Sequence, residues 1–209
     1  MNPWLIIPVK PFDAAKSRLA GVLPAAQRAA LSAHLLARTL RTAVTAECFA
    51  QVVVVSRDPA ALLLAERDAA LPLLEVGADL NAAVMQACDE AAARHASAAL
   101  ILPTDLPYLE PADLHRLVAA FTDHVTVVIA PSHDGGTNAL LLPLPAPFAF
   151  GFGDDSFHIH RTRAIHAGCR VYTVYTPALR FDLDAPHDWT ELATAAPFSV
   201  AALLADSPL

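Results

Sequence analysis

Residues 51–56 read Gln-Val-Val-Val-Val-Ser, a continuous β-branched run without the polar alternation of a half-exposed strand. Such a run is typical of a parallel strand that is buried on both faces of its sheet. Apolar residues at helical spacing precede it over residues 24–45, and Asp58-Pro59 introduces a second helical segment over residues 60–70. A strand between two helical segments predicts a βαβ arrangement and therefore a sheet protein of the α/β class.

The same alternation of short apolar runs and helical periods extends along most of the chain. Strands are expected at residues 4–9, 71–76, 98–102, 125–130, 138–142 and 171–175, with a last extended segment at 179–184. Helices are expected from an N-cap at Asn81 to residue 95, over 111–121, from a cap at Ser156 to 167, and over 186–195. The pattern predicts one domain over residues 1–209, a three-layer α/β/α sandwich with a mostly parallel sheet.

Composition narrows the class of protein. Of the 209 residues, 55% are hydrophobic and 17% charged, which is enough apolar material for a sizeable core. The net charge is −7 and there is no block of Lys or Arg, which argues against a nucleic-acid partner. No apolar run approaches the ~20 residues of a membrane span. The three cysteines form no C-x-x-C pair, so we expect neither a disulfide framework nor a structural zinc site, and we expect a cytoplasmic protein.

Polar residues cluster just beyond the predicted strands. In open α/β sheets, ligands bind outside the carboxyl ends of the strands, so these residues are the candidates for a binding site. Cations, small residues and carboxylates at one edge suggest a triphosphate and its metal ion. The candidates, in chain order, are Lys10, Lys16, Arg18, Asn81, Asp105, Thr137, Gly153, Ser156, Asp182 and Asp184.

Lys10, Lys16 and Arg18 carry the strongest signal for an anion. They lie in the segment that joins the first strand to the first long helix, where backbone N–H groups and the positive end of the helix dipole favour negative charge. The alternative is that they are only the solvated part of a loop. The chain has no Walker A glycine pattern, which excludes a P-loop protein.

Asp105 lies in Leu-Pro-Thr-Asp-Leu-Pro, directly after a predicted buried strand and between two prolines. A metal ligand needs a carboxylate on a rigid element, and this position supplies one, although Asp is also favoured in ordinary turns. Asp182 and Asp184 form an Asp-x-Asp whose side chains point the same way if the backbone is extended. Counted with Asp105, they favour a Mg²⁺ site over a turn.

The remaining candidates are ambiguous on their own. Gly135-Gly136-Thr137 can approach a ligand closely or simply form a hairpin turn. Gly153 and Ser156 precede a helix, where they can bind an anion or act as an ordinary N-cap, and Asn81 has the same ambiguity.

Six motifs occur in an order that resembles the 2-phospho-L-lactate guanylyltransferase family, and the resemblance covers residues 4 to about 193. The most specific part is the combination of Pro-Val-Lys-x5-Lys-Ser-Arg-Leu with Gly-Thr-Asn-Ala-Leu-Leu-Leu. The motif Leu-Pro-x-Asp-x-Pro occurs across related nucleotidyltransferases. The motifs are IIPVKPFDAAKSRL (6–19), DLNAAV (79–84), LPTDLP (102–107), GGTNALLL (135–142), FGDDSFHIH (152–160) and LRFDLDAPHDW (179–189).

The resemblance implies a GT-A-type nucleotidyltransferase fold, GTP as the donor and a small phosphorylated acid as the acceptor, in biosynthesis of coenzyme F-420. The acceptor would be 2-phospho-L-lactate, phosphoenolpyruvate or 3-phosphoglycerate. By motif, the triphosphate would be held by Lys10, Lys16 and Arg18, and Asn81 would lie by the nucleoside. Mg²⁺ would be bound by Asp105, Asp182 and Asp184. The acceptor would be bound by Thr137, Gly153 and Ser156. Asp105, Lys16 and Arg18 would be the catalytic residues.

Two features depart from the family pattern. The family commonly has Phe-Gly-Pro-Gly-Ser where this chain has two aspartates, Asp154 and Asp155, between Gly153 and Ser156. The loop at residues 132–136 is also a residue short and lacks an acidic–basic pair. Other hypotheses are a molybdopterin or sugar-phosphate nucleotidyltransferase of the same fold, disfavoured because no glycine-rich loop follows the first strand, or a non-catalytic nucleotide-binding regulator. The sequence is also compatible with a homodimer.

Overall fold

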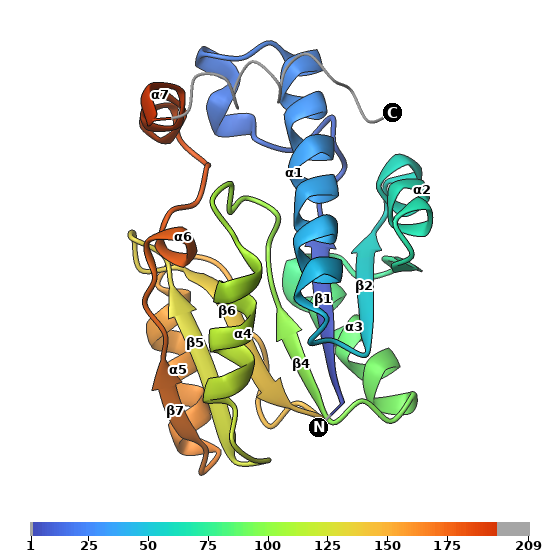
Figure 1. Ribbon diagram of the computed structural model, residues 1–209, viewed down its shortest axis with the longest axis vertical. Helices are drawn as coiled ribbons and strands as arrows, with labels where there is room; N and C mark the ends of the chain where they lie inside the picture. The colour runs from blue at the N-terminus through green and yellow to red at the C-terminus, as the bar shows by residue number, and fades with distance from the viewer. Residues whose placement is uncertain (1, 196–209) are drawn as a thin grey trace.

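The computed structural model describes residues 2–195, which contain a seven-stranded sheet in the order β3-β2-β1-β4-β6-β5-β7 (Figure 1). Strand β6 pairs antiparallel with β4 and β5, whereas the other neighbouring pairs are parallel. The prediction of a mostly parallel sheet is confirmed. The strands are β1 (Pro3–Val9), β2 (Gln51–Ser56), β3 (Leu71–Leu74), β4 (Ala98–Ile101), β5 (Thr126–Pro131), β6 (Thr137–Pro143) and β7 (Arg170–Thr173).

Helices cover both faces of the sheet, as the sandwich prediction requires (Figure 1). One face packs against α1 (Ala25–Ala46), α2 (Pro59–Arg67) and α4 (Pro111–Ala120). The other packs against α3 (Leu80–Ala93) and α5 (Ser156–His166). Residues 17–21 form a 3₁₀ turn, η1 (Ser17–Gly21), and the chain continues after β7 with α6 (Pro177–Arg180) and α7 (Pro186–Ala195).

The side-chain period of two along a strand explains how one strand serves both faces. In β1, Leu5 and Ile7 are buried in the core under α1 and α2, and Ile6 is buried in the core under α3. In β2, Val54 and Val55 divide between the same two cores. A strand buried on both faces has no polar side to show, which is why residues 51–56 lack alternation.

A smaller apolar cluster joins η1, α1 and the C-terminal part of the chain. The cluster buries Leu19 of η1, Leu35 of α1, Leu183 in the segment before α7, and Leu192 of α7. Trp189 packs alongside. This cluster fixes the segment that carries Lys16 and Arg18 beside residues 181–184. Two stretches more than 160 positions apart in the sequence thereby meet at one end of the sheet.

Three local predictions differ from the structure. Helix α3 begins at Leu80 with Asp79 as its N-cap, the Asp79 carboxylate accepting from the backbone N–H of Ala82 at 2.9 Å, so Asn81 is not the cap. Helix α5 is preceded by Asp155 in a left-handed conformation, so Ser156 is its first residue. The segment 179–184 is extended only after α6 ends at Arg180. Within residues 2–195, no helix has the length and apolar character to cross a membrane.

Candidate active site

The site lies where the parallel strands end and β6 begins. The segments after β1 and β4 carry Lys16 and Asp105 to this edge of the sheet. Because β6 runs in the opposite direction, its first residues, Thr137 and Asn138, reach the same edge. The expectation that polar residues beyond the strand ends would share one place is met for most of the candidates.

Lys16 and Asp105 form an ion pair across this edge. The Lys16 Nζ atom lies 3.2 Å from Asp105 Oδ2, and the two side chains are 8% and 26% exposed. Lys16 has a left-handed backbone (φ 54°), which costs a non-glycine residue about 1–2 kcal/mol and tends to persist at functional sites. The other carboxylate oxygen, Asp105 Oδ1, is buried and has no hydrogen-bond partner among residues 2–195.

A second ion pair lies two residues further along the same loop. Arg18 Nη1 is 2.9 Å from Asp184 Oδ2, and the two side chains are 67% and 38% exposed to solvent. The backbone N–H of Leu183 donates to the carbonyl oxygen of Asp105 at 2.8 Å. This bond ties the segment after β4 to residues 182–184. The three predicted carboxylates, Asp105, Asp182 and Asp184, are therefore carried by two adjacent backbone segments.

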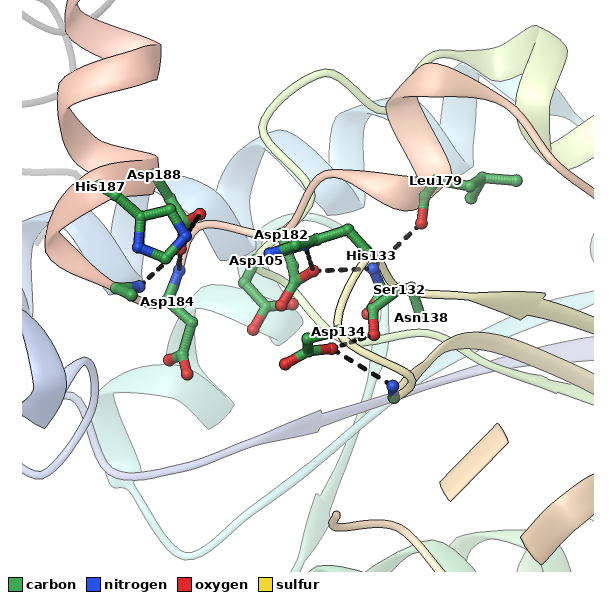
Figure 2. Close-up of polar contacts among 12 residues, drawn as sticks. Asp105, Ser132, His133, Asp134, Asn138, Leu179, Asp182, Asp184, His187 and Asp188 are labelled. Carbon is green, nitrogen blue, oxygen red and sulfur yellow. Dashed lines mark hydrogen bonds and ion pairs between the residues drawn. The ribbon is translucent and has the colours of Figure 1, made fainter. Parts of the chain in front are cut away.

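Asp182 lies in an electrostatically unfavourable place (Figure 2). Burial raises the pKa of its carboxyl, and the negative charges of Asp105 and Asp134 raise it further. The amide of Asn138 opposes this effect by donating to Asp182 Oδ1 at 3.2 Å, and His133 Nδ1 lies 3.4 Å from the same oxygen. Asp182 thus has one amide donor in a region rich in negative charge.

Asp134 is a carboxylate of this region that the sequence reasoning did not select. The hydroxyl of Ser132 and the backbone N–H of Gly136 donate to its Oδ1 atom, and these bonds hold the pKa of Asp134 below its usual value. It follows β5 as Asp105 follows β4, so its position after a buried strand was the signal that could have found it. Figure 2 shows its carboxylate on the same side as those of Asp105 and Asp182.

The charge of this group of carboxylates is only partly balanced by neighbouring protein groups. A hard divalent cation prefers several oxygen ligands, and the site offers the unpartnered Asp105 Oδ1 and the poorly neutralised Asp182. Among the described residues, the three side chains whose ligand atoms all lie within 4.8 Å of one another are His133, His187 and Asp188, and the four aspartates of the site do not form such a group. Asp188 Oδ2 already accepts from the backbone N–H groups of Asp184 and Ala185, so it has a structural role in starting α7.

The predicted acceptor residues also meet, on the α5 side of the site. The Ser156 hydroxyl donates to Thr137 Oγ1 at 3.1 Å, and both residues are buried. Gly153 has φ 134°, a conformation that side chains disfavour, and leads into α5. Asp154 and Asp155 are exposed, so these two carboxylates face water.

The last two candidates, Asn81 and Lys10, belong neither to the carboxylate group nor to the Thr137–Ser156 pair. The side chain of Asn81 bonds the backbone of Phe152 twice, accepting from its N–H at 2.7 Å and donating to its carbonyl at 3.2 Å. It therefore supports the loop before Gly153. Lys10 is exposed directly after β1 and belongs to neither ion pair.

Comparisons with known proteins identify the family of the chain. The family model described as "Guanylyl transferase CofC like" matches residues 4–196. A phosphoenolpyruvate guanylyltransferase of Rubrobacter xylanophilus is 40% identical over 193 residues, 92% of this chain and 94% of that protein. A 2-phospho-L-lactate guanylyltransferase of Methanocaldococcus vulcanius is 29% identical over 90% of this chain and 83% of that protein.

Solved structures add the fold. A nucleotidyl transferase from Methanothermobacter superposes with a TM-score of 0.67 at 15% identity, over 93% of this chain and 97% of that one. The match of the family model, the level of identity and the shared nucleotidyltransferase fold lead to one conclusion: this chain belongs to the CofC-like guanylyltransferase family.

Proposed function

We propose that this enzyme transfers GMP from GTP to phosphoenolpyruvate and releases pyrophosphate, as a step towards coenzyme F-420. The observation that carries the proposal is the pair of cation–carboxylate contacts, Lys16–Asp105 and Arg18–Asp184, beside the half-buried Asp182. The choice of acceptor rests on relatives at 35–40% identity, which are named phosphoenolpyruvate guanylyltransferases. The relative named for 2-phospho-L-lactate is less similar, at 29%.

Mg²⁺ would be held by Asp105, Asp182 and Asp184. The buried and unpartnered Asp105 Oδ1 and the raised pKa of Asp182 support this assignment, because both indicate negative charge that the protein alone does not neutralise. Bound there, the ion would offset charge on the phosphates and polarise the phosphoryl group under attack.

The reaction needs no covalent enzyme intermediate. The acceptor's phosphate is mostly dianionic at neutral pH, so one of its oxygens can attack the α-phosphorus of GTP directly. A new P–O–P bond forms to GMP, the bond between the α-phosphorus and the bridging oxygen breaks, and pyrophosphate leaves with the electron pair. Neither partner has to gain or lose a proton in this step.

The obstacle is repulsion between two polyanions, which the chain's own cations would offset. Two unit charges 4 Å apart repel by about 4 kcal/mol at an effective dielectric of 20, and several such pairs arise here. Lys16 is nearly buried and is held at the edge of the sheet by Asp105, so its charge is fixed in place beforehand. Arg18 is exposed and free to follow the triphosphate.

The acceptor would bind on the opposite side of the carboxylates, at Thr137, Gly153 and Ser156. Thr137 begins β6 and Ser156 begins α5, so the sheet and a helix fix the two hydroxyl groups relative to each other. The exposed backbone at Gly153 leaves room for an anion beside them. Lys10 would supply a further, more distant charge for GTP, and Asn81 would shape the loop between the two substrates.

A pyrophosphate-release assay tests the proposal. Each NTP is paired with phosphoenolpyruvate, 2-phospho-L-lactate and 3-phosphoglycerate, with Mg²⁺ or with chelator. We expect the largest kcat/KM for GTP with phosphoenolpyruvate and no turnover in chelator. Faster turnover with another acceptor would overturn the choice of phosphoenolpyruvate, and full activity in chelator would overturn the metal assignment.

A further inference from the structure

A buried chain of hydrogen bonds ends at Thr137. His160 of α5 has no exposed surface, and each of its ring nitrogens has one partner. The backbone N–H of Gly151 donates to His160 Nε2 at 3.0 Å, and His160 Nδ1 lies 3.0 Å from Thr137 Oγ1. The Ser156 hydroxyl reaches the same threonine oxygen at 3.1 Å.

The backbone fixes which ring nitrogen of His160 carries the proton. A peptide N–H can only donate, so Nε2 must present its lone pair to Gly151, and the proton of the neutral ring lies on Nδ1. Burial, with a smaller contribution from the charge of Arg163, lowers the pKa of His160 to about 4, so the ring is neutral at physiological pH. His160 Nδ1–H therefore donates to Thr137.

The approach of Gly151 is itself enforced. A Cβ atom at position 151 would lie 2.5 Å from Ile159 Cγ2, so only glycine fits against α5 here. The guanidinium of Arg163 holds the same segment by donating to the carbonyl oxygens of Ala149 and Phe150 at 2.9 and 2.8 Å. The donor to His160 Nε2 is thus a rigid one.

The polarity of Thr137 follows from these bonds. Its hydroxyl oxygen has two lone pairs, and His160 and Ser156 both donate to it. Its own hydrogen is then the one remaining hydrogen-bonding function of that hydroxyl. Ser156 in turn directs its hydroxyl hydrogen at Thr137, which leaves its oxygen without a hydrogen for an anion. Of the two hydroxyl groups, Thr137 is the one that can donate outward.

We infer that His160 is a positioning residue that makes Thr137 an obligatory hydrogen-bond donor to the acceptor's anionic group, with Ser156 supporting Thr137 rather than donating to the acceptor. The inference rests on the proposed acceptor site. An ionised phosphate or carboxylate can only accept hydrogen bonds, so a hydroxyl locked as a donor favours it over neutral or protonated groups. The chain of bonds would thereby select for the charge of the acceptor.

Two substitutions at position 160 separate this role from simple packing. In His160→Asn the short amide places its nitrogen near the former Nδ1 and can still donate to Thr137. In His160→Gln the longer amide reaches towards Gly151 and leaves Thr137 without that donor. His166→Asn, at an exposed position near the end of α5, is the matched control.

The kinetic measurement is the KM for acceptor and for GTP in the pyrophosphate-release assay. We expect His160→Gln to raise the acceptor KM at least about tenfold, the loss typical of a hydrogen bond to a charged group, with the GTP KM unchanged. His160→Asn should stay within about threefold of wild type, and Thr137→Val should raise the acceptor KM more than Ser156→Ala. Equal acceptor KM values for the Asn and Gln variants would overturn the inference.

A second measurement does not depend on activity. Nitrogen-15 NMR of the histidine side chains should show His160 neutral at pH 7, with its proton on Nδ1. A proton on Nε2, or a charged ring, would overturn the inference whatever the kinetics. Absence of turnover with GTP and every phospho-acid would instead refute the proposed function, and the NMR result would stand apart from it.

Discussion

Asp182→Asn should stabilise the fold while it removes activity. In the native protein the pKa of Asp182 is raised by burial and by the charges of Asp105 and Asp134. An acid whose native pKa lies above its unfolded value contributes stability at low pH and loses it as pH rises through the native pKa. At neutral pH the ionised Asp182 therefore costs stability, and a neutral amide of the same shape removes that cost.

The size and sign of the effect follow from the contacts. The Asp182 side chain is 14% exposed, so screening by water is limited, and we expect a gain of about 1 kcal/mol. For a chain of this length that raises Tm by about 2–4 °C. Asp105→Asn should have the opposite sign and cost about 1–3 kcal/mol, because it leaves the nearly buried Lys16 ammonium without its carboxylate.

Mg²⁺ should reverse the order of the Tm values of wild type and Asp182→Asn. At a concentration a hundred times its Kd, a ligand that binds the native state stabilises it by about 2.7 kcal/mol. Wild type should gain that amount and Asp182→Asn much less, so the variant is the more stable protein in chelator and the less stable one in Mg²⁺.

Differential scanning calorimetry at pH 7.5, with and without Mg²⁺, checks this prediction, and pyrophosphate release reports the loss of turnover. Asp89→Asn, an exposed carboxylate on α3, is the control and should change neither quantity. A variant less stable than wild type in chelator would refute the electrostatic argument. Equal gains in Mg²⁺ would show that Asp182 is not a ligand.

Other substitutions test other parts of the site. Lys16→Ala should lower kcat/KM for GTP by about a hundredfold or more, and Lys10→Ala by much less, in the same assay. Arg18→Ala should change the free energy of unfolding by less than about 0.5 kcal/mol, because its ion pair is exposed, yet raise the KM for GTP severalfold in steady-state kinetics. Asn81→Ala should lower Tm by a few degrees, about 1–2 kcal/mol, through loss of its two bonds to Phe152. His160, with a native pKa of about 4 against 6.5 when unfolded, should contribute about 3 kcal/mol that is present above pH 6.5 and lost as pH falls towards 4. Urea unfolding of wild type and His160→Asn across that range would show the difference, and parallel curves would contradict it.

The sequence predicted the sheet well because each strand is a local pattern. The β-branched run at 51–56 and the apolar run at 4–9 each predict a buried strand, and neither prediction depends on distant residues. The place of β6 between β5 and β4 depends on its pairing with β4, which lies far away in the sequence, so periodicity alone could not assign it. The N-caps of α3 and α5 were misplaced by two residues and one residue, because several polar residues near each start are acceptable caps.

The site was predicted in part for the same reason. Lys16 and Asp105 lie in the segments that follow β1 and β4, and these segments begin at the carboxyl edge of the sheet. Asp134 lies in a short loop whose sequence does not indicate where its carboxylate points. Its two hydrogen-bond donors, Ser132 and Gly136, are recognisable only in the folded structure. His160 ends the motif at residues 152–160, but its burial between Gly151 and Thr137 depends on the packing of α5, which the motif does not indicate.

The hairpin between β5 and β6 has a consequence for how acceptor preference can change during evolution. Thr137 is anchored by its pairing with Pro131 across the hairpin, so the five-residue tip at 132–136 can lengthen, shorten or change charge without moving it. That tip carries Asp134 and His133 towards the reaction centre. Residues 132–136 could therefore be replaced by the corresponding loop of a homologue without changing the rest of the chain. The short loop of this chain is a length change that the sheet tolerates.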